Sequence, residues 1–295
     1  MKILLLGANG QVGIELHRRL AALGDVIATT RSGVLADGTP CESADFDQPD
    51  TLLGLIERSA PDLVVNAAAY TAVDRAEDDV EAAFRANAHA PAAIAQACAA
   101  RDIGLVHYST DYVFDGTGTQ AYREDDATSP LGVYGASKLA GEDAIRASGV
   151  RHHILRTAWV YALHGQNFLR TMLRVGAERD HLRVVADQVG CPTPAWLIAD
   201  TTAALLRAQI EPGTYHLVTS GQTSWHGFAE AIFEDAYRAG LLPRVPAVDA
   251  ITTADYPTRA HRPACSVLDC SRLASALGTP LPAWRDALRT TLAAG

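Results

Sequence analysis

Basic residues are scarce in this sequence compared with acidic ones. The 25 Lys and Arg residues stand against 34 Asp and Glu residues, which gives a formal net charge of -9. A protein that binds a nucleic-acid duplex needs a basic face to displace counterions from the phosphates, so we expect no nucleic-acid partner. The charge balance does not exclude a small anionic ligand, because a few local donors are enough to hold one.

Cysteine pairs and metal-binding histidine motifs are also missing. The five cysteines, Cys41, Cys98, Cys191, Cys265 and Cys270, include no CxxC pair. Such a scattered, odd set is typical of a reducing compartment and indicates neither a zinc site nor a redox motif. The ten histidines form no HExxH or similar spacing, so we expect no bound transition metal.

Long apolar runs are absent. No stretch approaches the ~20 apolar residues that a membrane span requires, and the run near Met1 ends at Gly7, too early for a signal peptide. We therefore expect a soluble, cytoplasmic protein with no membrane partner. With 295 residues, of which 48% are apolar and 20% charged, the chain has the composition of a folded protein with one large or two modest domains.

Short apolar runs alternate with segments of helical periodicity in the first half of the chain. Repeated β-α-β units predict an α/β fold, a doubly wound parallel sheet of the Rossmann type. We expect a dinucleotide-binding domain over residues 1–161. A smaller domain that mainly binds substrate should cover residues 162–295, with the chain crossing back to the first domain. The predicted strands are Lys2–Leu6, Val26–Thr30, Leu63–Ala69, Gly104–Ser109, Ile154–Val160, Leu182–Ala186 and Tyr215–Val218. The predicted helices begin at Gln11, after Pro49, at Asp74 (ending at Ala100), and at Tyr134, Ala195 and Trp225.

A glycine-rich turn separates the first predicted strand from the first helix. In the segment Gly7-Ala8-Asn9-Gly10-Gln11-Val12-Gly13, Gly7 allows a tight turn and Gly10 lets a phosphate approach the backbone. Gly13 lets the helix pack on the strand. A dinucleotide pyrophosphate binds at such a place, where free amides and the positive end of a helix meet. The strand–turn–helix context favours a cofactor site over a simple tight turn.

A second motif opens the helix that begins at Tyr134. Tyr134 and Lys138 are four residues apart and share one helix face, so a cation near the phenol is expected to lower its pKa and make it a usable acid. One βα unit earlier, Thr110 follows a strand at the edge that faces the ligand crevice, where its hydroxyl can hold a substrate carbonyl. Each feature alone has a plainer explanation, a solvated Tyr–Lys pair or a helix-capping threonine; together they predict an active site.

With these motifs, the chain resembles the extended short-chain dehydrogenase/reductases and, among them, the dTDP-4-dehydrorhamnose reductase family. The resemblance covers nearly the whole length. Its segments are Gly7–Gly13, Asn66–Asp74, Tyr108–Phe114, Tyr134–Lys138, Arg156–Tyr161, Asn167-Phe168, Asp187-Gln188 and Tyr256–Pro263.

The resemblance implies positions for the cofactor and the sugar. The residues it places along the cofactor are Gly10, Gln11, Val12, Asp45, Phe46, Ala69, Tyr70, Thr71, Tyr108 and Lys138. It places Thr110, Asp111 and Trp159 at the sugar, although a strand tryptophan is as readily a core residue. Arg259 and Arg262 are candidates for the substrate diphosphate, or else a solvated surface pair.

The resemblance implies reduction of a 4-keto sugar, in which the cofactor supplies hydride, Tyr134 the proton, and Thr110 a hydrogen bond to the oxygen. Related dehydratases carry a glutamate where this chain has Tyr112, so we do not expect dehydration. Two alternatives remain open at this stage. A nucleotide-sugar 4-epimerase uses the same tyrosine, and a regulatory subunit has the same fold without catalysis.

Two positions depart from the family pattern. The second strand ends in Thr30 and Arg31 without a carboxylate, and an arginine can pair with a 2′-phosphate. We therefore expect NADPH to be preferred, with NADH as a second cofactor, unless Arg31 points to solvent. Some family members depend on magnesium; Glu15 matches one of the acidic ligands, but Trp196 stands at another, so we predict no metal. The sequence leaves open whether the protein is a monomer or a homodimer.

Overall fold

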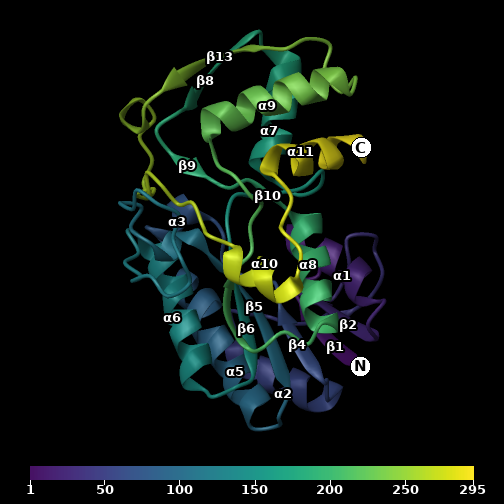
Figure 1. Ribbon diagram of the computed structural model, residues 1–295. Coiled ribbons are helices and arrows are strands. Elements are labelled where there is room, and N and C mark those ends of the chain that lie inside the picture. The colour runs from purple at the N-terminus through teal and green to yellow at the C-terminus, as the bar shows by residue number, and fades with distance from the viewer.

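The central sheet has seven strands, and all of them run parallel. The computed structural model describes all 295 residues. The first strand lies in the middle of the sheet, and later strands are added on both sides of it (Figure 1). This doubly wound α/β arrangement is the predicted fold class. From edge to edge the strands are β11 (Gly213–His216), β6 (His152–Thr157), β5 (Gly104–Thr110), β4 (Leu63–Asn66), β1 (Lys2–Leu6), β2 (Asp25–Thr30) and β3 (Glu42–Ser43).

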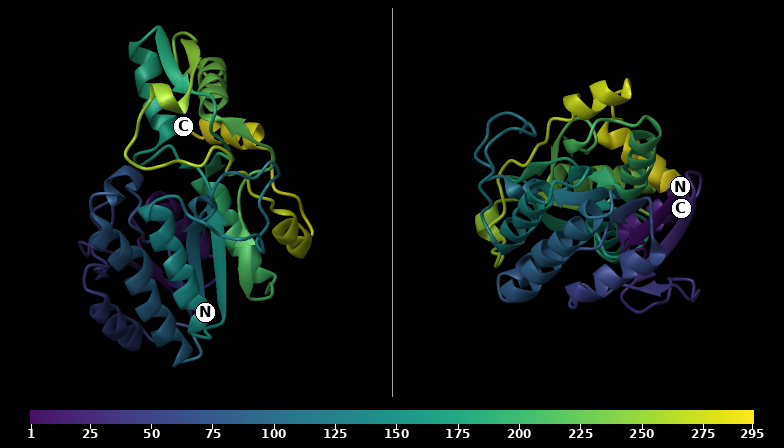
Figure 2. Two further views of the ribbon diagram at one scale, coloured as in Figure 1. Left: turned by 90° about the vertical axis from the view of Figure 1, so that its left-hand side faces the viewer. Right: turned by 90° about the horizontal axis from the view of Figure 1, so that it is seen from below.

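Helices cover both faces of the sheet, because side chains that alternate along buried strands must be shielded from water on each side. One face packs against α2 (Pro49–Ser59), α5 (Ala90–Ala99) and α6 (Val133–Ala147). The other face packs against α1 (Gln11–Leu20), α8 (Ala195–Arg207) and α10 (Ser271–Leu277). Strand β11 and helices α8 and α10 come from the second half of the chain, which therefore contributes to both parts of the molecule (Figure 2).

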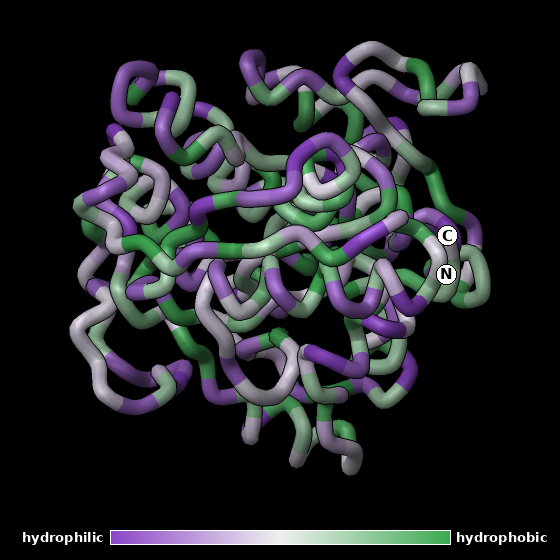
Figure 3. Tube along the Cα trace, turned by 90° about the horizontal axis from the view of Figure 1, so that it is seen from above, coloured by the Kyte–Doolittle hydropathy of each residue, from purple (hydrophilic) through white to green (hydrophobic).

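A smaller part stands above the carboxyl ends of the strands (Figure 1). Its apolar core lies between α7 (Phe168–Glu178), α9 (Trp225–Arg238) and α11 (Trp284–Ala293). Strands β8 (His181–Val185) and β13 (Ala247–Ile251) pair in parallel over α9. Two short pairs complete this part: β7 (Val160–Tyr161) with β10 (Thr193–Pro194), and β9 (Val189–Gly190) with β12 (Thr223–Ser224). Seen from above, many of the outer turns of the molecule are hydrophilic (Figure 3).

Several predicted elements are shorter or more broken in the structure. The strand expected to reach Ala69 ends at Asn66, and the strand expected to reach Val160 ends at Thr157. Trp159 adopts a left-handed backbone conformation with φ of 45°, which separates β6 from β7. The structure also contains α7, α10, α11 and β13, which the sequence pattern did not predict. None of the helices combines the length and apolar composition needed to span a bilayer.

The helix expected from Asp74 to Ala100 is divided into α3 (Val73–Ala76), α4 (Val80–Phe84), a π-helical turn (Arg85–His89) and α5. Pro91 has no amide hydrogen, so the carbonyl of Asn87 lacks its normal helical donor. The Asn87 carbonyl instead lies against α6, where a Cβ on Gly141 would come within 2.1 Å of its oxygen. Local helical periodicity was therefore correct, but the continuity of the helix was not.

Candidate active site

An open cleft of about 830 Å³ lies between the carboxyl ends of the strands and the smaller part. The cleft is lined by residues that the sequence predicted to be catalytic, cofactor-binding or substrate-binding. They are Gly7, Gly10, Gln11, Val12, Arg31, Phe46, Ala69, Tyr70, Thr71, Tyr108, Thr110, Asp111, Tyr134, Lys138, Trp159 and Arg262. Four further predicted residues, Gly13, Thr30, Asp45 and Arg259, do not line the cleft.

The glycine-rich turn between β1 and α1 is shaped by close backbone contacts. Gly7 has φ of +84°, and a Cβ there would lie 2.8 Å from the amide nitrogen of Ala68. A Cβ on Gly13 would lie 2.0 Å from the Gly7 carbonyl oxygen, so Gly13 acts in packing α1 against this turn. No side chain caps α1, and its first amides are left free at the cleft. These features fit a dinucleotide pyrophosphate, which needs a bare backbone and the positive end of a helix.

The end of β2 places one cation at the cleft. Arg31 is largely exposed, with Nε 4.0 Å from a carboxylate oxygen of Asp45 and Nη2 3.9 Å from one of Asp47. Phe46 is buried and lines the cleft between them. Thr30 points elsewhere, because its hydroxyl donates to the Val34 carbonyl at 3.1 Å. Arg31 is therefore the residue of this strand end that can reach a bound nucleotide.

Asn87 fixes the cleft segment that follows β4. Its side-chain oxygen accepts a hydrogen bond from the Tyr70 amide at 2.8 Å, and its side-chain nitrogen donates to the Tyr70 carbonyl at 3.0 Å. The same nitrogen donates to the Ser137 hydroxyl at 3.0 Å, which ties this segment to α6. Sequence reasoning missed Asn87, because its role depends on contacts with residues 17 and 50 positions away.

The three predicted catalytic residues meet at the end of β5. Thr110 is the last residue of β5, and Tyr134 and Lys138 are one turn apart on α6. The Thr110 hydroxyl donates to Oδ1 of Asp111 at 3.0 Å and accepts from the Tyr112 amide at 3.2 Å. Lys138 Nζ donates to the Tyr108 carbonyl at 2.6 Å and lies 3.3 Å from Nε2 of His107.

The expected effect of Lys138 on Tyr134 was wrong for the protein in this state. Burial raises the pKa of the Tyr134 phenol to about 12, and the nearby Thr110 hydroxyl offsets only part of that rise. Burial also lowers the pKa of Lys138 to about 8. The lysine is held by the Tyr108 carbonyl, which leaves desolvation as the largest influence on the phenol. Tyr134 therefore keeps its proton at neutral pH, as a proton donor must.

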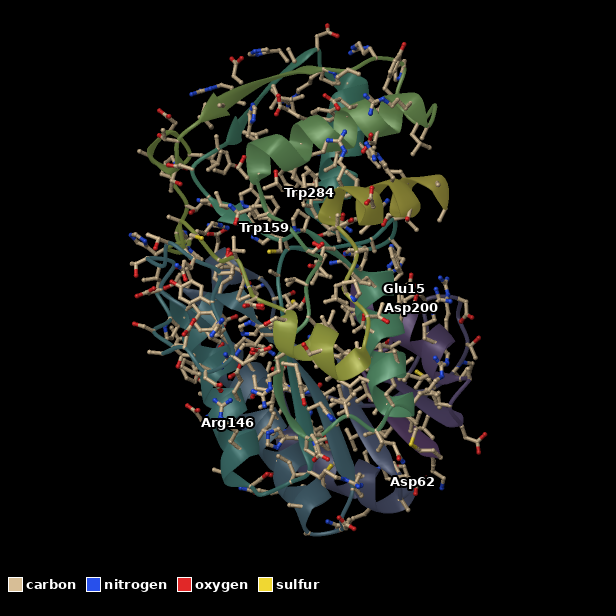
Figure 4. All side chains as sticks on the ribbon, viewed as in Figure 1. Glu15, Asp62, Arg146, Trp159, Asp200 and Trp284 are labelled. Atoms are coloured by element: carbon tan, nitrogen blue, oxygen red, sulfur yellow. The ribbon has the colours of Figure 1, made fainter.

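Trp159 stands at the junction of the two parts of the molecule (Figure 4). Its ring stacks on Trp225 with centroids 3.5 Å apart, and Trp225 also lines the cleft. A Cβ on Gly190 would lie 2.6 Å from the Trp159 ring, so only glycine leaves room for it. Trp159 is thus part of both the cleft wall and the aromatic core, the two placements that the sequence left open.

Asp111, Arg262 and Arg259, the charged residues predicted to bind substrate, have different surroundings. Asp111 is buried, which raises the pKa of its carboxyl group to about 6, and its Oδ2 has no hydrogen-bond partner. Arg262 lines the cleft and forms two hydrogen bonds to Asp74, at 3.0 and 2.7 Å. Arg259 forms an ion pair with Asp78 outside the cleft.

The residues considered for magnesium have other partners in the structure. Glu15 lies 3.0 Å from Nε2 of His164, and the indole of Trp196 donates to Thr291 at 2.9 Å. No group of three or more His, Cys, Asp or Glu side chains is arranged to hold a metal ion.

Comparison with known proteins gives matches over the full length of the chain. The family model described as the RmlD substrate binding domain matches residues 1–295. A dTDP-4-dehydrorhamnose reductase of Burkholderia thailandensis is 48% identical, with 98% of this chain and 97% of the relative covered. The reductase of Salmonella typhimurium is 44% identical, with 99% and 97% covered.

Solved structures of the same family also match this chain over its full length. The dTDP-4-dehydrorhamnose reductase of Bacillus anthracis, in complex with NADP, has a TM-score of 0.90 at 30% identity and covers 100% of this chain and 99% of its own. A Clostridium acetobutylicum reductase gives 0.89 at 33% identity, with 99% and 98% covered. A UDP-glucose 4-epimerase of Thermus thermophilus, at 21% identity, shares the fold alone. By full-length sequence match and by structure, this chain belongs to the dTDP-4-dehydrorhamnose reductase family, described by the RmlD substrate binding domain model.

Proposed function

We propose that the protein reduces the 4-keto group of dTDP-4-dehydro-L-rhamnose to give dTDP-L-rhamnose, with NADPH as the preferred reductant. The observation that carries the proposal is the meeting of Thr110, Tyr134 and Lys138 in a cleft that begins at the glycine-rich turn. Chains similar over their whole length, at 44% and 48% identity, are reductases of this sugar nucleotide. Under this proposal the product enters nucleotide-sugar biosynthesis.

The cofactor fits the residues of the cleft. Gly7, Gly10 and the free amides of α1 would hold the pyrophosphate, and Phe46 would border the adenine. Ala69, Tyr70 and Thr71 would line the middle of the cofactor, and Tyr108 the nicotinamide end. The Bacillus anthracis relative was solved with NADP, which supports a phosphorylated cofactor here. When bound, the cofactor supplies the hydride that reduces the sugar carbonyl.

The side chains of the protein orient the reacting groups and supply a proton. Tyr134, which is protonated at neutral pH because burial raises its pKa to about 12, donates its proton to the oxygen of the 4-keto group as negative charge develops there. Thr110 donates a second hydrogen bond to the same oxygen once it turns from Asp111. Lys138 holds the ribose of the nicotinamide half, and it keeps the local charge positive in its ammonium form.

The two parts of the molecule would divide the work. Residues 1–161 would bind the dinucleotide, and residues 162–295 would mainly bind the sugar nucleotide. Trp159 and Trp225 would form the wall against which the sugar lies, and Asp111 would bind a sugar hydroxyl. Arg262 is the cation at the cleft that a diphosphate could share with Asp74.

One assay separates the three functions considered. The purified protein is mixed with NADPH and dTDP-4-dehydro-L-rhamnose, oxidation of NADPH is followed, and the product is identified. A reductase consumes one NADPH per sugar and exchanges its cofactor freely. Tightly retained NAD with inversion at C4 and no net oxidation would identify an epimerase. Binding of NADPH without consumption by any 4-keto sugar would identify a regulatory subunit.

A further inference from the structure

A buried polar chain lies behind Lys138, on the side away from the open cleft. Asn66, at the end of β4, contacts His107 on the neighbouring strand β5, and His107 contacts Lys138 on α6. The separations are 3.0 Å between Asn66 Nδ2 and His107 Nδ1, and 3.3 Å between His107 Nε2 and Lys138 Nζ. All three side chains are 1–2% exposed, so no solvent competes for these contacts.

The hydrogen-bond directions in this series of side chains are fixed at Asn66, the end away from Lys138. The backbone amide of Ala68 donates to Oδ1 of Asn66 at 3.1 Å. Because that oxygen must face the amide of Ala68, the side-chain nitrogen of Asn66 faces His107, and this nitrogen can only donate. The reversed side chain would set two N–H groups against each other at Ala68. His107 must therefore accept at Nδ1.

A neutral histidine that accepts at Nδ1 carries its proton on Nε2. Burial keeps the pKa of His107 well below its usual range, so the ring stays neutral. Its Nε2–H group thus points at Lys138 Nζ. An ammonium group has three donors and no acceptor, whereas a neutral amine has a lone pair that can accept this hydrogen bond.

We propose that His107 is a positioning residue that, oriented by Asn66, directs its Nε2–H at Lys138 and favours the neutral amine over the ammonium. The pair therefore sets the pH at which Lys138 loses its proton. The catalytic consequence rests on the proposed function, because it is through Lys138 that the reaction would feel the change. The hydrogen-bond directions themselves do not depend on that function.

Other groups around Lys138 act in both directions. Glu142, one turn further along α6, favours the ammonium, but its charge is shared with Arg156 on β6 through contacts of 2.7 and 2.9 Å. The Tyr108 carbonyl on β5 accepts from Nζ and is compatible with either form. Tyr134 lies one turn before Lys138 and stays neutral. His152, on β6, acts on His107 rather than on Lys138.

The net effect of these groups agrees with the lowered pKa of Lys138. Burial lowers the pKa of Lys138 to about 8, and Glu142 opposes that shift. None of Asn66, His107 and Lys138 has a buried polar atom without a partner. A neutral amine satisfies the whole chain, whereas an ammonium leaves two N–H groups facing each other at 3.3 Å.

The first test uses nitrogen NMR of histidine-labelled protein at neutral pH, with His107→Gln to assign the signal. We expect His107 to be protonated at Nε2 and bare at Nδ1. In Asn66→Asp the carboxylate accepts from His107, so the proton should move to Nδ1. A wild-type ring protonated at Nδ1 would overturn the proposal, and this result is obtained whether or not the protein reduces any sugar.

The second test is the pH profile of kcat/KM for NADPH-dependent reduction of dTDP-4-dehydro-L-rhamnose. In His107→Gln an amide oxygen can accept from the ammonium, so the alkaline limb should move to higher pH by roughly one unit, a tenfold change in proton affinity. His107→Leu, which removes the N–H group, should move the limb the same way by less. The control His152→Gln should leave it in place.

A purely structural role for His107 would lower activity at every pH without moving the limb. An alkaline limb that stays in place, or moves to lower pH, in both His107 variants therefore refutes the proposal. If the wild-type protein reduces no sugar, the proposed function fails, and the NMR result alone decides the inference.

Discussion

The indole rings of Trp159 and Trp225 lie parallel within 4°, with centroids 3.5 Å apart. Trp159 follows the last residues of β6, and Trp225 begins α9 in the smaller part, so this stack joins the two sides of the cleft. Trp159 also holds a left-handed backbone conformation, which costs of order 1–3 kcal/mol for a residue other than glycine. The stack with Trp225 offsets part of that cost.

Replacing Trp225 should therefore affect the sugar more than the cofactor. In Trp225→Leu we expect KM for the sugar nucleotide to rise by roughly 3–10-fold, the loss expected from an aromatic pair, with KM for NADPH nearly unchanged. The control is Trp284→Leu, which removes a tryptophan that packs against the same core but does not line the cleft. Equal effects of the two variants on KM would mean that Trp225 acts only through stability.

Tyr134→Phe should lower turnover by ~100-fold or more while cofactor binding is retained, because the phenol is the proton donor. The measurements are steady-state kinetics and NADPH binding by fluorescence. Tyr112→Phe serves as the control, since the Tyr112 ring lies 5.6 Å from the Tyr134 ring and lines the same cleft. Near-normal turnover in Tyr134→Phe would exclude the mechanism.

Arg31→Ala should weaken use of NADPH by roughly 1–3 kcal/mol in kcat/KM, the value of a charged hydrogen bond, and leave NADH nearly untouched. The converse variant is Asp47→Asn, which removes a carboxylate 3.9 Å from the guanidinium. It should improve NADPH relative to NADH, because a phosphate is repelled by that charge. A loss of equal size with both cofactors in Arg31→Ala would show that the arginine is structural.

Glu142→Gln should destabilise the fold by about 3–5 kcal/mol, because it leaves the buried guanidinium of Arg156 without its counter-charge. Glu142 is 0% exposed and Arg156 2%. The adjacent variant Asp143→Asn, which removes an exposed partner of Arg146, should change stability by about 0.5 kcal/mol or less. Urea denaturation of both variants measures the difference, and comparable losses would contradict the burial argument.

The buried carboxyl of Asp111 should make stability depend on pH. Its pKa is raised from 3.8 to about 6, so the folded state holds the proton that the unfolded state has lost. Stability therefore falls as pH rises from about 4 to about 6, and the loss persists above that range. Asp111→Asn lacks this titration. The melting temperature of Asp111→Asn minus that of the wild type should be larger at pH 7 than at pH 4. A difference that does not change with pH would contradict the raised pKa of Asp111.

The sequence by itself determined the class of fold, because strand and helix periodicity and the glycine-rich turn are local patterns. It also placed Thr110, Tyr134 and Lys138 correctly at one strand end and one helix face, since βα connections bring the carboxyl ends of parallel strands to a single edge. Family resemblance extended this to Trp159, whereas Arg31 was singled out because Thr30 and Arg31 depart from the family pattern. The helix after Pro49 and the strand Lys2–Leu6 needed no tertiary information.

Only the tertiary structure decided what these residues contact. Helical periodicity could not show what surrounds the π-helical turn before α5, because the approach of Gly141 to the Asn87 carbonyl and the hydrogen bonds between Asn87 and Tyr70 join residues far apart in the sequence. The pKa of Tyr134 rises rather than falls, since burial is a property of the packed cleft and not of the spacing to Lys138. The contact of His107 with Asn66 joins neighbouring strands 41 residues apart. Local sequence specifies which side chains are available, and long-range packing specifies their partners, their exposure and hence their charge.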